Sequence, residues 1–123
     1  MLLDTSAWVE LFEATKKTVR IKEILTKETC YTSIVTIAEI VNWAEKEKRN
    51  YKEIIENVGK ASIVIGLNES ISTLAGRLNF ERKKSNKKWG MLDSFILATA
   101  KVYGLDILTS DNDFRDITNA EIL

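Results

Sequence analysis

The chain has 123 residues, of which 45% are hydrophobic and 29% are charged, and its 18 basic and 18 acidic residues give a formal net charge of zero. This length supports one hydrophobic core and is too short for two, so we expect a single domain over residues 1–123. A chain without excess positive charge is not built to coat nucleic acid through bulk charge.

Cysteine and histidine usage narrows the chemistry further. The chain has one cysteine, Cys30, and no histidine. It therefore has no intramolecular disulfide, and a zinc site would lack its usual ligands. The usual acid–base pair of metal-independent ribonucleases is also missing. Only three residues precede Asp4, and no apolar run approaches the roughly 20 residues of a membrane span, so we expect no signal peptide, no membrane partner and a cytoplasmic location.

Short apolar runs alternate with segments of helical spacing along the whole chain. The predicted elements are a strand at 1–4, helices at 7–12 and 19–27, a strand at 29–33, helices at 34–49 and 51–59, a strand at 62–65, a helix after Asn68, a helix at 91–103, and strands at 107–109 and 121–123. This alternation predicts the α/β class, with a mostly parallel central sheet of about four or five short strands flanked by helices.

Acidic residues stand where several of these segments begin or end. They are Asp4, Glu39, Asp93, Asp111 and Asp113. Ligands of open parallel sheets bind outside the carboxyl ends of the strands, and Asp4 and Asp111 are expected at such ends. Like charges about 5 Å apart repel by roughly 3 kcal/mol at an effective dielectric near 20, so converging carboxylates must share protons or bind a divalent cation.

Each acid also has an ordinary structural interpretation. Asp4 can cap the helix that follows it, and Asp111 and Asp113 suit an Asx turn. Asp93 can occupy the first turn of its helix, where free backbone amides favour an acid. The apolar stripe predicted for the 34–49 helix, which includes Ile34, places Glu39 on the opposite, solvated side. Only the joint arrangement of these residues is specific.

A basic cluster precedes Asp93. Its members are Arg82, Lys83, Lys84, Lys87 and Lys88, and no acid interrupts them. Lysines suit the carboxyl end of a helix, so a solvated helix end explains the cluster. The alternative is a rim that steers nucleic-acid phosphates towards the acids, with Lys83, Lys84, Lys87 and Lys88 as contacts and Trp89 as a base-stacking surface.

Four segments in order resemble the PIN domain, and especially its small VapC-like toxins. They are Leu3-Asp4-Thr5-Ser6, Thr36-Ile37-Ala38-Glu39-Ile40, Leu92-Asp93-Ser94-Phe95-Ile96-Leu97-Ala98-Thr99-Ala100 and Leu108-Thr109-Ser110-Asp111-Asn112-Asp113-Phe114. The resemblance covers essentially the whole chain. The lysine-rich segment before Asp93 and the absence of proline depart from common family patterns.

The resemblance implies a site as well as a fold. It assigns one or two Mg²⁺ or Mn²⁺ ions to Asp4, Glu39, Asp93 and Asp111, an auxiliary role to Asp113, and supporting hydroxyl groups to Thr5 and Thr109. Such ions suit hard oxygen ligands and can activate a water for attack on a phosphodiester. The implied activity is therefore an endoribonuclease that leaves 5′-phosphate and 3′-hydroxyl ends. The implied partners are an RNA substrate, a cognate antitoxin and a second copy of the chain.

Other functions fit parts of the pattern. A non-toxin RNA-processing nuclease would use the same acids, and a non-catalytic PIN-like module would bind RNA or protein without using them. A phosphoacceptor receiver domain would need a lysine after a late strand, but Ser110 follows Thr109. A haloacid-dehalogenase-like phosphatase would need an aspartate two residues after Asp4, where Ser6 stands.

Overall fold

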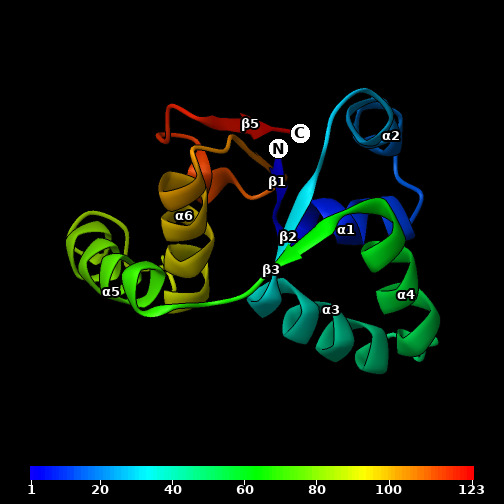
Figure 1. Cartoon of the computed structure of the whole chain (residues 1–123), viewed down its shortest axis with the longest axis horizontal. Coiled ribbons are helices and arrows are strands. Elements are labelled where there is room, and N and C mark those ends of the chain that lie inside the picture. The colour runs from blue at the N-terminus through cyan, green and yellow to red at the C-terminus, as the bar shows by residue number, and fades with distance from the viewer.

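Five short parallel strands form one sheet in the computed structural model, which describes residues 1–123 (Figure 1). The strands are β1 (Leu2–Leu3), β2 (Tyr31–Ser33), β3 (Ile63–Ile65), β4 (Ile107–Thr109) and β5 (Ala120–Ile122). Their spatial order is β3-β2-β1-β4-β5, and every neighbouring pair is parallel. The predicted α/β class and parallel sheet are confirmed.

Six α-helices cover the two faces of the sheet. They are α1 (Thr5–Phe12), α2 (Thr18–Lys27), α3 (Ile34–Lys46), α4 (Tyr51–Ala61), α5 (Glu69–Lys83) and α6 (Met91–Tyr103), with a short 3₁₀ helix η1 (Asn112–Phe114) before β5. Helices α5 and α6 lie on one side of the sheet, and α1, α3 and α4 lie on the other (Figure 1). Helix α3 ends three residues earlier than predicted, just before Lys48 adopts a positive φ of 56°.

Adjacent residues of the central strands point to opposite faces of the sheet. Leu2 and Ile107 pack in one hydrophobic cluster with residues of α6. Leu3 and Leu108 pack in the other cluster, with residues of the first four helices. All four side chains are fully buried. Both faces of these strands must therefore be apolar, which explains the unbroken hydrophobic runs in the sequence.

The strand order reverses between β1 and β4. Along the chain, the sheet first grows from β1 through β2 to β3, and the chain then returns to the other side of β1 for β4 and β5. Leu2 pairs with Ile107 and Leu3 with Leu108, so β1 and β4 end at the same level. Asp4 and the segment 110–111 therefore leave the sheet side by side.

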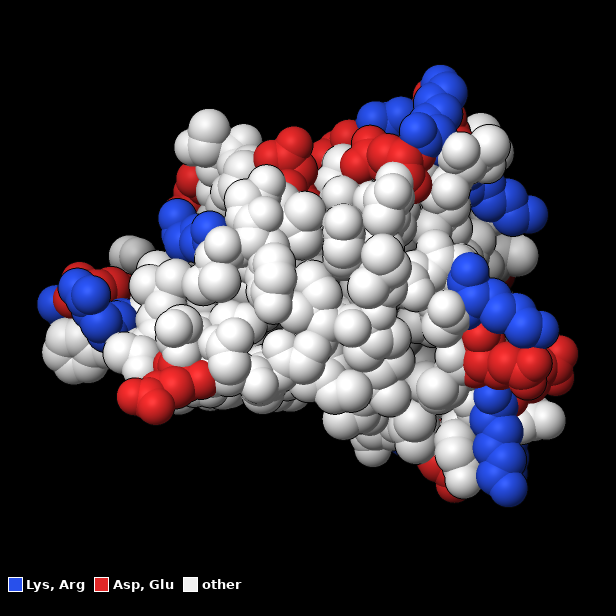
Figure 2. Space-filling model, viewed as in Figure 1, with Lys and Arg blue, Asp and Glu red and all other residues white.

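None of the six helices combines the length and the apolar character that a membrane crossing requires. The face of the molecule seen in Figure 2 is uncharged over its centre, and Lys, Arg, Asp and Glu gather around its margin. Strand β3 is an edge strand, and Ile63 and Val64 on it are 53% and 39% exposed.

Gly104 ends α6 in the left-handed conformation, with φ of 64°, where a Cβ atom is strained. We predict that Gly104→Ala lowers the free energy of unfolding by about 1 kcal/mol. Gly59→Ala is the matched control, because Gly59 lies within α4 and a Cβ there meets nothing within 4 Å. This control should gain about 0.5 to 1 kcal/mol. Urea denaturation checks both values, and equal effects would contradict the prediction.

Candidate acidic active site

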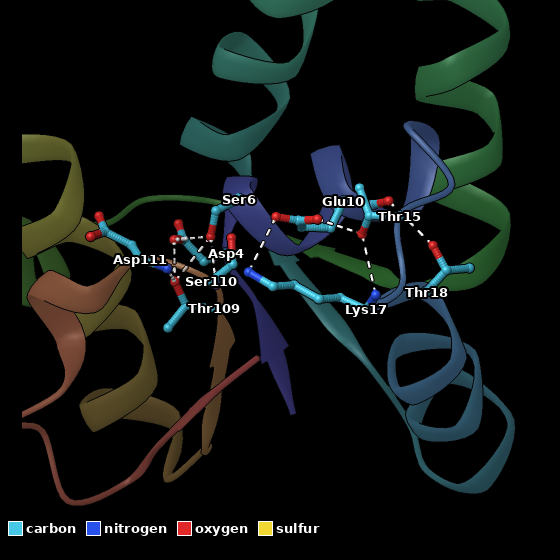
Figure 3. Close-up of polar contacts among 9 residues, drawn as sticks. All are labelled: Asp4, Ser6, Glu10, Thr15, Lys17, Thr18, Thr109, Ser110 and Asp111. Atoms are coloured by element: carbon cyan, nitrogen blue, oxygen red, sulfur yellow. Dashed lines mark hydrogen bonds and ion pairs between the residues drawn. The ribbon is translucent and has the colours of Figure 1, made fainter.

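Asp4 lies at the carboxyl end of β1 and caps α1, with only 5% of its surface exposed. Its Oδ1 accepts a hydrogen bond from the Thr5 amide at 2.8 Å. Its Oδ2 accepts from the hydroxyl groups of Thr109 at 2.9 Å and Ser6 at 3.1 Å (Figure 3). The prediction that Asp4 caps a helix is confirmed. Its carboxylate is hydrogen-bonded by residues at the ends of both β1 and β4.

Ser6 joins the segments that follow β1 and β4. Its Oγ lies 3.0 Å from Thr109 Oγ1 and accepts a hydrogen bond from the Ser110 amide at 2.9 Å (Figure 3). The Asp111 amide in turn donates to Thr109 Oγ1 at 3.0 Å. Ser6 is not among the site residues that the sequence predicts. Its only signal there is a hydroxyl group two residues after a strand-ending aspartate.

Glu39 lies on α3 beside Thr5. The Thr5 hydroxyl donates to Glu39 Oε1 at 2.6 Å and lies 3.2 Å from the hydroxyl oxygen of Thr36. The helical face predicted for α3 is therefore wrong. The buried positions of α3 are Thr36, Ile40 and Ala44, whereas Ile34, taken as part of the apolar stripe, is 42% exposed. This rotation brings Glu39 next to Thr5.

Asp93 occupies the first turn of α6, as its structural interpretation predicts. Its Oδ2 accepts a hydrogen bond from the Gly90 amide at 3.1 Å. Burial raises the pKa of Asp93 to about 6, against this hydrogen bond, and the negative charges of Asp4, Asp111 and Asp113 raise it further. Asp93 is therefore close enough to all three carboxylates to feel their charge.

The same electrostatic coupling includes the other acids. Burial raises the pKa of Asp4 to about 6, although hydrogen bonds from Thr109, Thr5 and Ser6 oppose the rise, and the charge of Glu39 adds to it. Burial also raises the pKa of Glu39, with a further contribution from the charge of Asp93. The four acids thus share one electrostatic environment, in which each disfavours ionisation of another.

Asp111 and Asp113 lie in the loop after β4. Asp111 Oδ1 accepts a hydrogen bond from the Asp113 amide at 2.9 Å and so caps η1. This is the local turn expected for the pair. Beside the network, Lys17 Nζ lies 3.4 Å from Glu10 Oε1, which places an ion pair next to the acids (Figure 3).

The donor chemistry of the site fits a hard divalent cation. Every candidate ligand is a carboxylate, and neither a thiol nor an imidazole lies among them. No group of three or more acidic side chains is arranged so that it could already enclose one ion. By their chemistry, Asp4, Glu39, Asp93 and Asp111 are the residues that could hold Mg²⁺ or Mn²⁺.

The lysines of the basic cluster and the adjacent Trp89 differ in exposure. Lys83, Lys84, Lys87 and Lys88 are exposed, at the end of α5 and in the loop before α6. The stacking role predicted for Trp89 is wrong, because its side chain is fully buried. Its Nε1 donates to Ser94 Oγ at 2.7 Å, and its ring centre lies 4.9 Å from that of Phe114. Trp89 is a core residue.

Comparisons with known proteins agree with this architecture. A family model described as the PIN domain matches residues 1–120. VapBC2 from Rickettsia felis, solved on a promoter DNA fragment, superposes with a TM-score of 0.81 at 17% identity over 99% of this chain and 97% of its own. A toxin–antitoxin complex from Klebsiella pneumoniae gives 0.79 at 22% identity, covering 98% and 94%. No curated protein matches.

A third structure is VapC20 from Mycobacterium tuberculosis, described as a toxin that cleaves the sarcin–ricin loop. It gives a TM-score of 0.77 at 15% identity and covers 98% of this chain and 97% of its own. At such identities these structures show a shared fold.

We predict that Asp93→Asn stabilises the metal-free protein at pH 7 and not at pH 4. The folded pKa of about 6 exceeds the ordinary 3.8, so this group adds most stability below pH 4 and loses it as the pH rises through 6. Replacing the charge should therefore gain about 1 to 2 kcal/mol at pH 7, a shift discounted for partial exposure. Chemical denaturation at both pH values measures the gain.

Asp106→Asn is the matched control, because Asp106 is exposed and lies before β4, away from the strand ends that carry the acids. It should change stability by less than about 0.5 kcal/mol at either pH. A gain for Asp93→Asn of the same size at pH 4 and pH 7 would show that the charge is not its cause.

Proposed function

The chain belongs to the PIN domain family, and from this premise we propose that it is a metal-dependent endoribonuclease and the toxin of a toxin–antitoxin pair. The observation that carries the proposal is the burial of Asp4 at the reversal of strand order, with Glu39, Asp93 and Asp111 in the same electrostatic environment. Gathering these charges destabilises the free protein, and a bound cation removes that penalty.

The proposed metal ligands are Asp4, Glu39, Asp93 and Asp111, with Asp113 as an auxiliary acid. These residues would hold a divalent ion, and the chemistry it would supply there is activation of a water and neutralisation of charge that develops on the phosphodiester. Thr109 and Ser6 orient the Asp4 carboxylate through their hydroxyl groups, and Thr5 orients Glu39. These supporting groups keep the ligands in place before substrate arrives, so less ordering is needed during the reaction.

RNA is the proposed substrate. Support comes from VapC20, which is described as cleaving the sarcin–ricin loop and shares this fold. The exposed Lys83, Lys84, Lys87 and Lys88 lie in the segment that leads to α6, and Asp93 stands in the first turn of that helix. Phosphates bound by these lysines would bring a single strand or loop to the acids.

An antitoxin and a second copy of the chain are the proposed protein partners. The structures from Rickettsia felis and Klebsiella pneumoniae are toxin–antitoxin complexes, which supports the first partner. The exposed Ile63, Val64 and Leu67 near the edge of the sheet supply apolar surface for a partner, and the face seen in Figure 2 carries no charge over its centre. Action in the cytoplasm is part of the same proposal.

We predict that the purified protein cleaves a labelled structured RNA with Mg²⁺ or Mn²⁺ and not with EDTA. Asp4→Asn should lower the cleavage rate by at least about 100-fold, because it removes a charged ligand from the site. Asp106→Asn, the exposed control, should cleave at the normal rate. The products should carry 5′-phosphate and 3′-hydroxyl ends, which enzymatic end-labelling detects. Cyclic phosphate ends or equal cleavage by the Asp4 variant would exclude this mechanism.

We predict that changing all four exposed lysines of the cluster to glutamine weakens RNA binding and flattens its salt dependence. Each lost phosphate contact should reduce the slope of log K against log salt by about 0.7 for single-stranded RNA. The control changes four exposed lysines on α2 and α4, namely Lys22, Lys27, Lys52 and Lys60, to glutamine. Fluorescence anisotropy across a salt series gives both slopes. Equal slopes in the two variants would make the cluster a solvated helix end.

A further inference from the structure

Arg82 belongs to the basic cluster by sequence, but the structure separates it from the lysines. Its side chain is only 17% exposed, and its Nε is buried without a hydrogen-bond partner. We propose that Arg82 is a positioning residue, which holds the loop of Asp111 and Asp113 against the segment that leads to Asp93. This inference rests on the proposed metal-dependent function.

The guanidinium group of Arg82 binds the loop on both sides of Phe114. Nη1 and Nη2 donate to the two carboxylate oxygens of Asp116 at 3.1 and 3.0 Å. Nη2 also donates to the backbone carbonyl of Asp113 at 3.0 Å. One side chain at the end of α5 therefore fixes the backbone of the turn that follows Asp111. Of the contacts made by Arg82, the one to the Asp113 carbonyl lies nearest the acids.

The flat face of the same guanidinium lies on Trp89, with its central carbon 3.9 Å from the ring centre. Trp89 also packs against Phe114 and donates to Ser94, the residue after Asp93. The stack of Arg82, Trp89 and Phe114 thus connects the loop after β4 with the first turn of α6. Those are the two segments that carry Asp111 and Asp93.

This connection opposes a repulsion within the site. Asp111 and Asp113 follow β4 and Asp93 stands in the first turn of α6, so the like charges of the two segments repel each other when all three acids are ionised. The planar guanidinium group of Arg82 binds the loop and packs on Trp89, and so holds the segments together. A lysine cannot replace Arg82, because an ammonium group is neither planar nor bidentate. Misplacing a ligand by about 1 Å can cost two orders of magnitude in rate.

The test compares Arg82→Lys with Arg20→Lys. Arg20 also makes a bidentate ion pair, with Glu121 at 2.7 and 2.9 Å. This pair connects α2 to β5, and Arg20 contacts none of the acids of the candidate site. Mn²⁺ affinity is measured by titration at a temperature where both variants are folded. We expect Arg82→Lys to weaken Mn²⁺ binding by about 10-fold or more, a typical loss for residues that orient metal ligands, and Arg20→Lys to leave it unchanged.

Cleavage kinetics provide a second readout. At low Mn²⁺, Arg82→Lys should reduce kcat while the KM for RNA stays the same, and excess Mn²⁺ should restore kcat. A role confined to stability would lower the melting temperature of both arginine variants and leave Mn²⁺ affinity unchanged, which would overturn the inference. A raised KM for RNA with normal Mn²⁺ affinity would make Arg82 a phosphate contact and would also overturn it.

Two further outcomes are distinguishable. If the unaltered protein binds no Mn²⁺, the proposed metal-dependent function fails and the inference fails with it. If the unaltered protein binds Mn²⁺ and Arg82→Lys does not fold, Asp116→Asn decides instead. Asp116 is 71% exposed, and the change keeps the Arg82 side chain but removes the charged partner that holds its guanidinium group against the loop. Asp116→Asn should then weaken Mn²⁺ binding measurably, and normal binding would overturn the inference.

Discussion

A carboxylate buried between two parallel strand ends organises this molecule. Transfer of an ionised group out of water is costly unless it is hydrogen-bonded, and Asp4 receives hydrogen bonds from one amide and two hydroxyl groups. These donors come from the segment after β1 and from the last residue of β4, so the contacts that stabilise the buried charge also hold the two strand ends together where the strand order reverses. The raised pKa shows that they do not offset the full desolvation penalty.

Structural and functional interpretations of the acids are compatible here, because each oxygen can serve more than one partner. Asp4 caps α1, Asp93 caps α6 and Asp111 caps η1, each by accepting a hydrogen bond from a nearby backbone amide. A cap fixes the backbone on which the carboxylate stands and leaves lone pairs for another ligand. Acids at the starts of helices are therefore oriented by hydrogen bonds that the helices need in any case.

Those parts of the fold that depend on local sequence patterns could be predicted from the sequence. Apolar runs located β1 and β4, and the parallel arrangement then placed Asp4 and Asp111 at one edge of the sheet. Glu39 was placed on the wrong side of α3 because hydrophobicity favoured Ile34, whereas the core takes Thr36. A threonine that hydrogen-bonds within a site is buried for reasons that a hydrophobic pattern does not contain.

The exposure predicted for Trp89 and Arg82 is wrong for a related reason. Both stand within a run of lysines, and composition alone assigns such a run to the surface. Their burial depends on Phe114 and Asp116, more than 20 residues further along the chain, so no local pattern reveals it. The structure instead divides one basic segment into exposed lysines and a partly buried arginine that packs on the buried Trp89, with separate physical roles.

The chain has no net charge, but its acidic site is mostly ionised near neutral pH and therefore attracts cations. With raised pKa values of about 6, Asp4 and Asp93 are mostly ionised at pH 7, so a cation would displace few protons. Below pH 6 protons occupy the same carboxylates and compete directly. The desolvation that makes the site unfavourable when empty thus strengthens its attraction for a divalent ion near neutral pH, because a buried negative charge is screened less by water.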